Sequence, residues 1–197
     1  MSARDDILRT IRARKAPALP RPARYRRVLD DDLAERFATR ARAADATVEV
    51  LESMADVSGA VAGLLRARNM AACIHLPPGS AVAGLDWGQV RVLQTPPGPE
   101  DVAVALAPLG IGETGTLVFP AGEAAPASWH FRPGFEIAVL RVSDIVPDLE
   151  TALSSLRMQW PHTINLVTGP SRTADIEQTL ELGAHGPKAL AVLLVRV

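Results

Sequence analysis

Cysteine and aromatic residues are scarce in this sequence of 197 residues. The single cysteine, Cys73, excludes a disulfide within the chain. It also excludes a cysteine-ligated cluster held by this chain alone, because such clusters usually take four thiolates. Cys73 lies in the apolar run 71–76, so we expect a small buried hydrophobic residue there. With aromatic residues at 4%, the core must be built mostly from Ala, Val, Leu and Ile. The sequence therefore predicts a chain with no redox cofactor of its own.

Long apolar runs and a strong net charge are also missing. No run approaches the roughly 18 residues of a membrane-spanning helix, and the charged N-terminus has no apolar signal-peptide core. These absences predict a cytoplasmic chain without a membrane span. The net charge of −1 gives no general attraction to nucleic acid, so we expect no nucleic-acid partner.

Sequence patterns for metals and nucleotides are absent as well. The four histidines, His75, His130, His162 and His185, show no i, i+4 pair and have no cysteine partners, so no metal site is predicted. The sequence contains neither a G-x-S-x-G elbow nor a phosphate-binding G-x-x-x-x-G-K-[ST] loop.

Residues 1–27 are predicted to form an appendage, and residues 28–197 a single α/β domain. Residues 3–14 place Ile7, Leu8 and Ile11 at helical spacing, and three prolines in 16–22 then end that helix. The appendage carries nine basic residues between Arg4 and Arg27 against two acidic ones. We expect it to be a solvated or partner-docking segment.

The remainder alternates between strand and helix patterns. Helices are predicted over 31–44, 57–67, 146–156 and 174–182, and strands over 47–51, 71–76, 89–93, 102–106, 115–119, 135–142, 163–168 and 189–197. Alternation with continuous apolar strands indicates a mainly parallel sheet covered on both faces. Ligands of such sheets bind beyond the carboxyl ends of the strands, so the loops that follow strands are the first candidates for a site.

The first candidate is a glycine-rich corner with a carboxylate inside it. It consists of Gly112, Glu113, Thr114, Gly115 and Thr116. Glu113 could act as a nucleophile, a base or an acceptor for a hydroxylated ligand. The alternative is a strand-entry turn in which Glu113 only accepts backbone N–H groups. The spacing is not a dinucleotide-binding fingerprint, because a strand and not a helix follows it.

The second candidate follows the strand 163–168 and opens the predicted helix 174–182. Its members are Gly169, Pro170, Ser171, Arg172, Thr173, Asp175 and Glu177. Free N–H groups at a helix start can hold an anion, and Arg172 would add positive charge. Asp175 and Glu177 can instead satisfy the helix dipole themselves. A weaker third element is the loop with His185 and Gly186, where His185 could be an acid–base group or a loop histidine that caps helix carbonyls. We predict that the two glycine corners meet in one ligand site.

The segments GIGETGTLV, SDIV, VTGPSRTADIE and GAHGPKAL occur in this order over residues 105–197. In this they resemble the lactate utilisation protein C family, the LUD domain. The resemblance implies a three-layer α/β/α sandwich like that of the sugar-isomerase and CoA-transferase superfamily. It also implies a role in oxidising L-lactate to pyruvate, beside partner subunits that carry iron–sulfur clusters. The chain departs from the family pattern at Gly112, where the family usually has Ala, and at Glu136, where it usually has His.

Two functions remain open from the sequence, and with them whether the chain is an enzyme. One is a non-redox component of a lactate-oxidising system that binds a small-molecule or nucleotide-like ligand. The other is an independent enzyme resembling CoA transferases, in which Glu113 is the acyl-accepting nucleophile.

Overall fold

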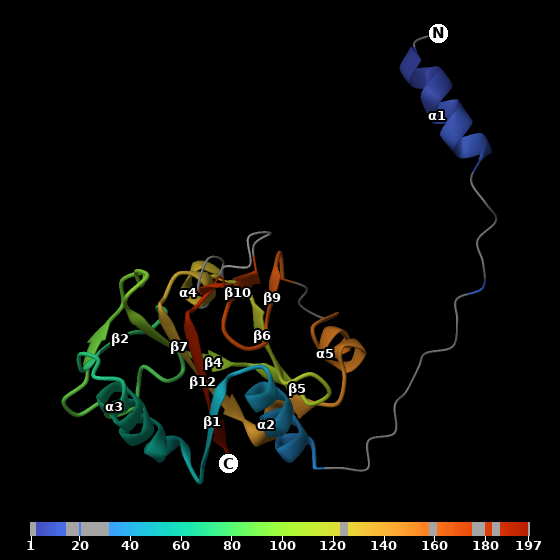
Figure 1. The fold of residues 1–197 in the computed structure, drawn as a ribbon. Coiled ribbons are helices and arrows are strands. Elements are labelled where there is room, and N and C mark those ends of the chain that lie inside the picture. The colour runs from blue at the N-terminus through green and yellow to red at the C-terminus, as the bar shows by residue number, and fades with distance from the viewer. Residues whose placement is uncertain are drawn as a thin grey trace.

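The centre of the molecule is a six-stranded sheet in which every pair of neighbours is parallel (Figure 1). The computed structural model describes residues 3–14, 20, 32–122, 126–157, 161–174, 180–182 and 186–196. In spatial order the strands are β1 (Thr47–Leu51), β12 (Ala189–Val195), β7 (Phe135–Arg141), β4 (Val102–Ala107), β2 (Cys73–His75) and β3 (Arg91–Leu93). The middle strands β12, β7 and β4 are almost wholly buried, which their continuous apolar sequences predict.

One face of this sheet is covered by α3 (Val57–Ala67), which follows the 3-10 turn Met54–Asp56. The turn is closed by Asp56, whose Oδ2 accepts the backbone N–H and the hydroxyl of Ser53, each at 2.9 Å. Along α3, Val57, Val61 and Leu65 recur every four residues and are buried against the sheet. The segment 82–90 completes this side of the core.

The opposite face is covered by α2 (Leu33–Ala43) together with a second, four-stranded sheet. Its strands, in spatial order, are β8 (Ile145–Val146), β5 (Leu109–Ile111), β6 (Thr116–Pro120) and β9 (Ile164–Val167). Phe37 of α2 is fully buried and packs with Phe119 of β6 and Leu140 of β7 in one cluster. Asp32 caps α2, because its Oδ1 accepts the N–H of Ala34 at 2.8 Å. This layer therefore combines a helix with a sheet.

Shorter elements complete the fold. The helix α5 (Leu149–Ser155) packs on the small sheet through the buried Ala152. The remaining elements are α4 (Ser128–Phe131), the 3-10 turn Val142–Asp144, β10 (Arg172–Ala174) and β11 (Leu180–Leu182).

The first helix, α1 (Ala3–Ala13), buries none of its residues (Figure 1). Ile7 and Ile11, which would form its apolar side, are 59% and 62% exposed. The helix predicted from the spacing of these residues is thus present, whereas the division of the chain at residue 27 stays a prediction.

The mainly parallel sheet with helices on its faces confirms the predicted α/β fold. The prediction of a helix over 174–182 is wrong. Residues 172–174 and 180–182 are extended and pair antiparallel, with Arg172 opposite Leu182 and Ala174 opposite Leu180. Leucines at 180 and 182 with Glu181 between them fit the two-residue period of a strand, and so short a segment does not separate the two periods.

Candidate functional site

The two glycine corners predicted from the sequence lie side by side. The first joins β5 to β6, and the second follows β9, which pairs antiparallel with β6 so that Leu117 lies opposite Val167. Thr116 and Thr168 consequently meet, with 2.7 Å between their Oγ1 atoms. Thr114 Oγ1 lies 2.6 Å from Thr116 Oγ1. These three hydroxyls form a continuous hydrogen-bonded row, which we call the hydroxyl ladder.

The third predicted loop adjoins the same place. The N–H of Ser171 donates to the carbonyl of Pro187 at 2.9 Å. A Cβ added at Gly186 would lie only 3.1 Å from the Cβ of Ser171, so the two chain segments are in contact. We call residues 112–116, 168–172 and 186–187 together the corner junction.

Two glycines of the junction are explained by packing on α2. Gly115 has φ +68° and Gly169 φ +70°, in the left-handed region that favours glycine. A Cβ on Gly115 would lie 2.4 Å from the backbone N of Ala41, and one on Gly169 would lie 2.0 Å from the carbonyl O of Ala44. Both corners are therefore seated on the C-terminal end of α2, and their glycines permit that contact without any ligand.

The location of the junction differs from the prediction. Pro187 lies just before β12, so the junction is at the amino end of that strand. The corners do not lie beyond the carboxyl ends of the parallel strands, where they were expected, because 109–111, 116–120 and 164–167 belong to the small sheet. The corners meet through antiparallel pairing and not through a shared edge of the parallel sheet.

The predicted anion site at a helix start is also wrong in its physical basis. Residues 172–174 form a strand, so no helix begins directly after Ser171, and among the described residues the helix end that contacts the two corners is the C-terminus of α2. A helix C-terminus carries partial negative charge. The guanidinium of Arg172 is paired with Asp45, with 2.8 Å between Nη2 and Oδ2, and both side chains are about half exposed.

Of the other predicted site residues, some are described by the structure and some are not. Glu113 is half-buried, and its N–H donates to the carbonyl of Pro147 at 3.1 Å, which continues the contact between β5 and β8. Gly112 lies against Leu33, and Pro170 is half-buried beside Gly169. Asp175, Glu177 and His185, as well as the side chain of Thr173, lie outside the described residues.

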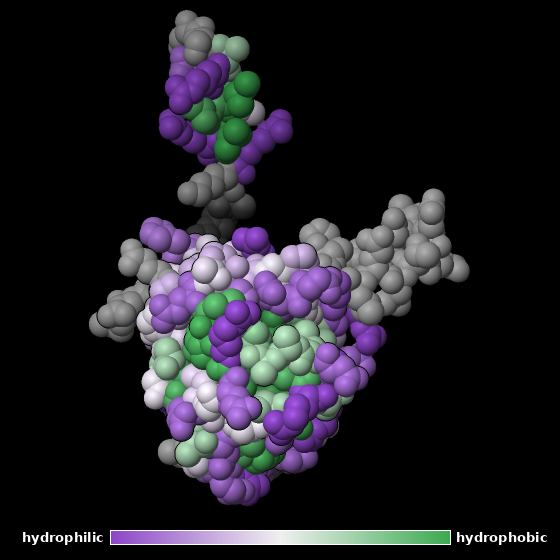
Figure 2. Space-filling model, turned by 90° about the vertical axis from the view of Figure 1, so that its left-hand side faces the viewer, coloured by the Kyte–Doolittle hydropathy of each residue, from purple (hydrophilic) through white to green (hydrophobic). Residues whose placement is uncertain are grey.

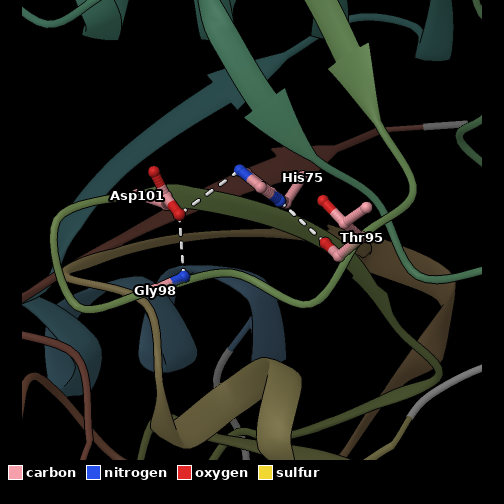
Figure 3. A network of polar contacts seen from close by, with 4 residues as sticks. All are labelled: His75, Thr95, Gly98 and Asp101. Carbon is pink, nitrogen blue, oxygen red and sulfur yellow. Dashed lines mark hydrogen bonds and ion pairs between the residues drawn. The ribbon is translucent and has the colours of Figure 1, made fainter.

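A polar network around His75, which the sequence did not point to, lies near the amino end of β4 (Figure 3). His75 is buried, and its Nδ1 donates to the carbonyl of Thr95 at 2.7 Å. Its Nε2 lies 3.5 Å from Oδ2 of Asp101, which also accepts the N–H of Gly98 at 2.7 Å. The hydrogen bond to Thr95 and the contact with Asp101 tie the loop 95–101 to His75 at the end of β2.

A second unanticipated pair is fully buried. His130 Nδ1 of α4 lies 2.6 Å from Glu136 Oε1 of β7, and the His130 ring stacks on Phe119 with 3.8 Å between centroids. Burial raises the pKa of the Glu136 carboxyl, and the hydrogen bond from His130 opposes that rise. His130 Nε2, Glu136 Oε2 and Nδ2 of Asn165, the residue opposite Phe119 in β9, have no partner among the described residues. The departure from the family pattern at Glu136 was the available signal, since a carboxyl in an apolar strand needs a partner.

Within the described residues, no group of three His, Cys, Asp or Glu side chains could hold a metal ion. No helix in that part of the chain is both long and apolar enough to cross a membrane.

Comparison with known proteins identifies relatives in the second half of the chain. The LUD domain model matches residues 99–195. Lactate utilization protein C of Geobacillus thermodenitrificans is 34% identical over 101 residues, and the protein of that name from Bacillus velezensis is 37% identical over 101 residues. Each of these alignments covers 48% of this chain and 42% of the relative, so the chain matches less than half the length of these curated relatives.

The fold has a counterpart among solved structures. A crystal structure of a DUF162 family protein from Deinococcus radiodurans superposes with a TM-score of 0.60 at 23% sequence identity. The match covers 83% of this chain and 96% of that one. The family model and the sequence relatives agree: residues 99–195 of this chain match the LUD domain family, and the chain shares its fold with the DUF162 family structure.

Proposed function

We propose that this chain serves lactate utilisation as a ligand-binding component without a redox cofactor, and that the corner junction is its ligand site. The names of the relatives support the process. The observation that supports the site is the hydroxyl ladder, which joins Thr116 to Thr168, 52 residues further along the chain. On this proposal the electrons of the oxidation pass to separate cytoplasmic subunits that carry iron–sulfur clusters.

The chemistry of the ladder suits a small hydroxy acid. Thr116 at its centre is buried, whereas Thr114 and Thr168 at its ends are exposed. Each hydroxyl can donate one hydrogen bond and accept others. Because the ladder uses two of its three protons, one exposed end can donate to a carboxylate while the other accepts from a ligand hydroxyl. Glu113, between Gly112 and Thr114, adds an acceptor for a ligand hydroxyl. Asp175, Glu177 and His185 are included in the proposed site because their segments adjoin the junction in sequence.

Calorimetric titration of the full chain with L-lactate and with pyruvate tests this function. The variant Thr116→Val keeps the side-chain shape and breaks the ladder, and we expect it to weaken binding about tenfold, the equivalent of one good hydrogen bond. Thr163→Val is the matched control, since Thr163 is an exposed threonine near the opposite end of β9. Equal affinity of the two variants, or no binding by the wild type, would contradict the proposed site.

A covalent test separates this function from acyl transfer. If Glu113 were an acyl-accepting nucleophile, incubation with an acyl-CoA would add mass to a peptide that contains it. We expect no such adduct.

We also expect the chain to co-purify with cluster-bearing subunits, and those subunits should carry all the iron of the complex.

A further inference from the structure

A groove runs between α3 and the edge strand β1, away from the corner junction. It has a volume of about 710 Å³ and is lined by apolar side chains that include Leu51 and Leu64. Its charged residues are both acidic, Glu49 on β1 and Asp56 at the start of α3. The groove therefore offers apolar side chains to a partner, and both of its charged residues are acidic.

The α3 side of the groove carries two glycines, Gly59 and Gly63, that neither close packing within the domain nor a positive φ requires. Gly59, Gly63 and Ala67 recur every four residues and therefore share one side of the helix. A Cβ at Gly59 or Gly63 would meet no atom within 4 Å, and neither residue has a positive φ. Glycine inside a helix costs roughly 0.5–1 kcal/mol relative to alanine. Small residues at this spacing allow the backbone of another helix to approach closely.

The chain itself supplies a helix that lacks a partner surface. Isolated helices shorter than about 12–15 residues are marginal in water, and α1 has 11 residues, none of them buried. Its apolar side is formed by Ile7, Leu8 and Ile11, of which Ile7 and Ile11 are 59% and 62% exposed, and hydrophobic surface is visible on this helix in Figure 2. Arg4 lies one turn before Ile7 and Leu8 and extends the same side with positive charge. The size, polarity and charge of this side thus complement the groove.

We propose that α1 of a second copy of this chain packs in the groove between α3 and β1, in a reciprocal exchange that forms a two-fold symmetric dimer. Ile7, Leu8 and Ile11 lie over Gly59, Gly63 and Leu64, and Arg4 reaches the acidic residues of the groove. A second copy is the occupant because α1 buries nothing against its own domain. The 17 residues between Arg14 and Asp32 can span up to about 60 Å, which is ample for an exchange. Reciprocity doubles the buried surface, as in other isologous dimers.

Sedimentation of the full chain at micromolar concentration tests the dimer. We expect a wild-type dimer whose dissociation constant rises about tenfold or more in Ile7→Asp/Ile11→Asp and in Gly63→Leu, which fills the groove. Two matched controls should remain dimeric. Ala13→Asp changes the opposite side of α1, and Gly84→Leu adds the same side chain as Gly63→Leu at an open position outside the groove. Circular dichroism should show that each variant is folded.

Cross-linking identifies the occupant directly. In a Cys73→Ser background, chains with Ile11→Cys are mixed with chains that carry Leu64→Cys and are then oxidised. A disulfide between the two kinds of chain supports the exchange. A third preparation carries both cysteines in one chain. The exchange would be overturned by a monomeric wild type, by a dimer that survives the α1 and groove variants, or by a disulfide that forms within the double-cysteine chain but not between the two single-cysteine chains.

Discussion

Replacing Gly169 with alanine tests whether the second corner is built for packing on α2. At φ +70° a residue with a Cβ pays roughly 1–2 kcal/mol. The new Cβ would also lie 2.0 Å from the carbonyl O and 3.0 Å from the carbonyl C of Ala44, so the backbone must shift. Overpacking of this kind costs about 1–3 kcal/mol. We therefore expect Gly169→Ala to lower the free energy of unfolding by about 2–5 kcal/mol, a large part of the roughly 5–15 kcal/mol of a typical domain.

The two contributions can be separated by urea unfolding followed by circular dichroism. Gly88 has φ +53° but no atom within 4 Å of an added Cβ, so Gly88→Ala should show only the conformational cost of about 1–2 kcal/mol. Gly84 has neither feature, and Gly84→Ala should change stability by no more than about 0.5 kcal/mol. If Gly169→Ala cost no more than Gly88→Ala, the close approach to Ala44 would be refuted. A variant of unchanged stability that had lost ligand binding would show that Gly169 serves the ligand.

Three further predictions concern ionisable and core residues. Because burial raises the pKa of Glu136, its contribution to stability is fully present below the ordinary value of 4.5 and is lost as pH rises through the raised value in the folded state. In thermal melts, Glu136→Gln should therefore lose less stability than the wild type as pH rises above 4.5. Parallel pH profiles of the two proteins would contradict this prediction. Arg172→Ala removes a half-exposed ion pair, so its free energy of unfolding should fall by at most about 1 kcal/mol, with a smaller difference in high salt. Phe37→Ala should cost about 3–5 kcal/mol in the same urea assay, whereas Phe131→Ala, which truncates a side chain that is 43% exposed, should cost far less.

Much of the parallel sheet could be predicted from local sequence. The strand 47–51 and the helix 57–67 have the predicted bounds, because the first is a short β-branched run and the second has apolar residues at four-residue spacing. The strand predicted at 135–142 is β7, which ends one residue earlier. The helix 57–67 and β7 are strongly patterned and buried against the main core, whereas the edge strand β1 buries only Leu51.

Two strands of the small sheet, β6 and β9, were predicted as strands, but β5, β8 and the pairing of β10 with β11 could not be predicted from local sequence. β5 contains only Leu109–Ile111, and its sequence with Gly110 in the middle reads as part of a glycine turn. A Cβ at Gly110 would lie 2.5 Å from Leu140, so this strand depends on tertiary contact that no local pattern encodes. The two glycine corners were predicted to be adjacent, as they are. The cause, the antiparallel pairing of β6 with β9, is a tertiary contact that the local sequence does not encode.

The pairing of His130 with Glu136 depends on tertiary structure too. The two residues are six apart, yet they meet only because α4 turns the chain back over β7. Glu136 in an apolar strand indicates that a partner is needed, but neither residue type nor spacing identifies His130 as that partner.

The position of β12 within the main sheet has a consequence for biosynthesis. β12 lies between β1 and β7, although it is the last strand of that sheet to be synthesised. Until residues 189–195 have left the ribosome, β1 has no neighbour in the sheet, and one edge of β7 stays open. Pairings between strands so distant in sequence form slowly, and open edges invite association with other chains. The nascent chain therefore passes through a stage in which β1 and β7 are synthesised but lack β12, the strand that lies between them. We expect chaperones to bind the chain mainly at that stage.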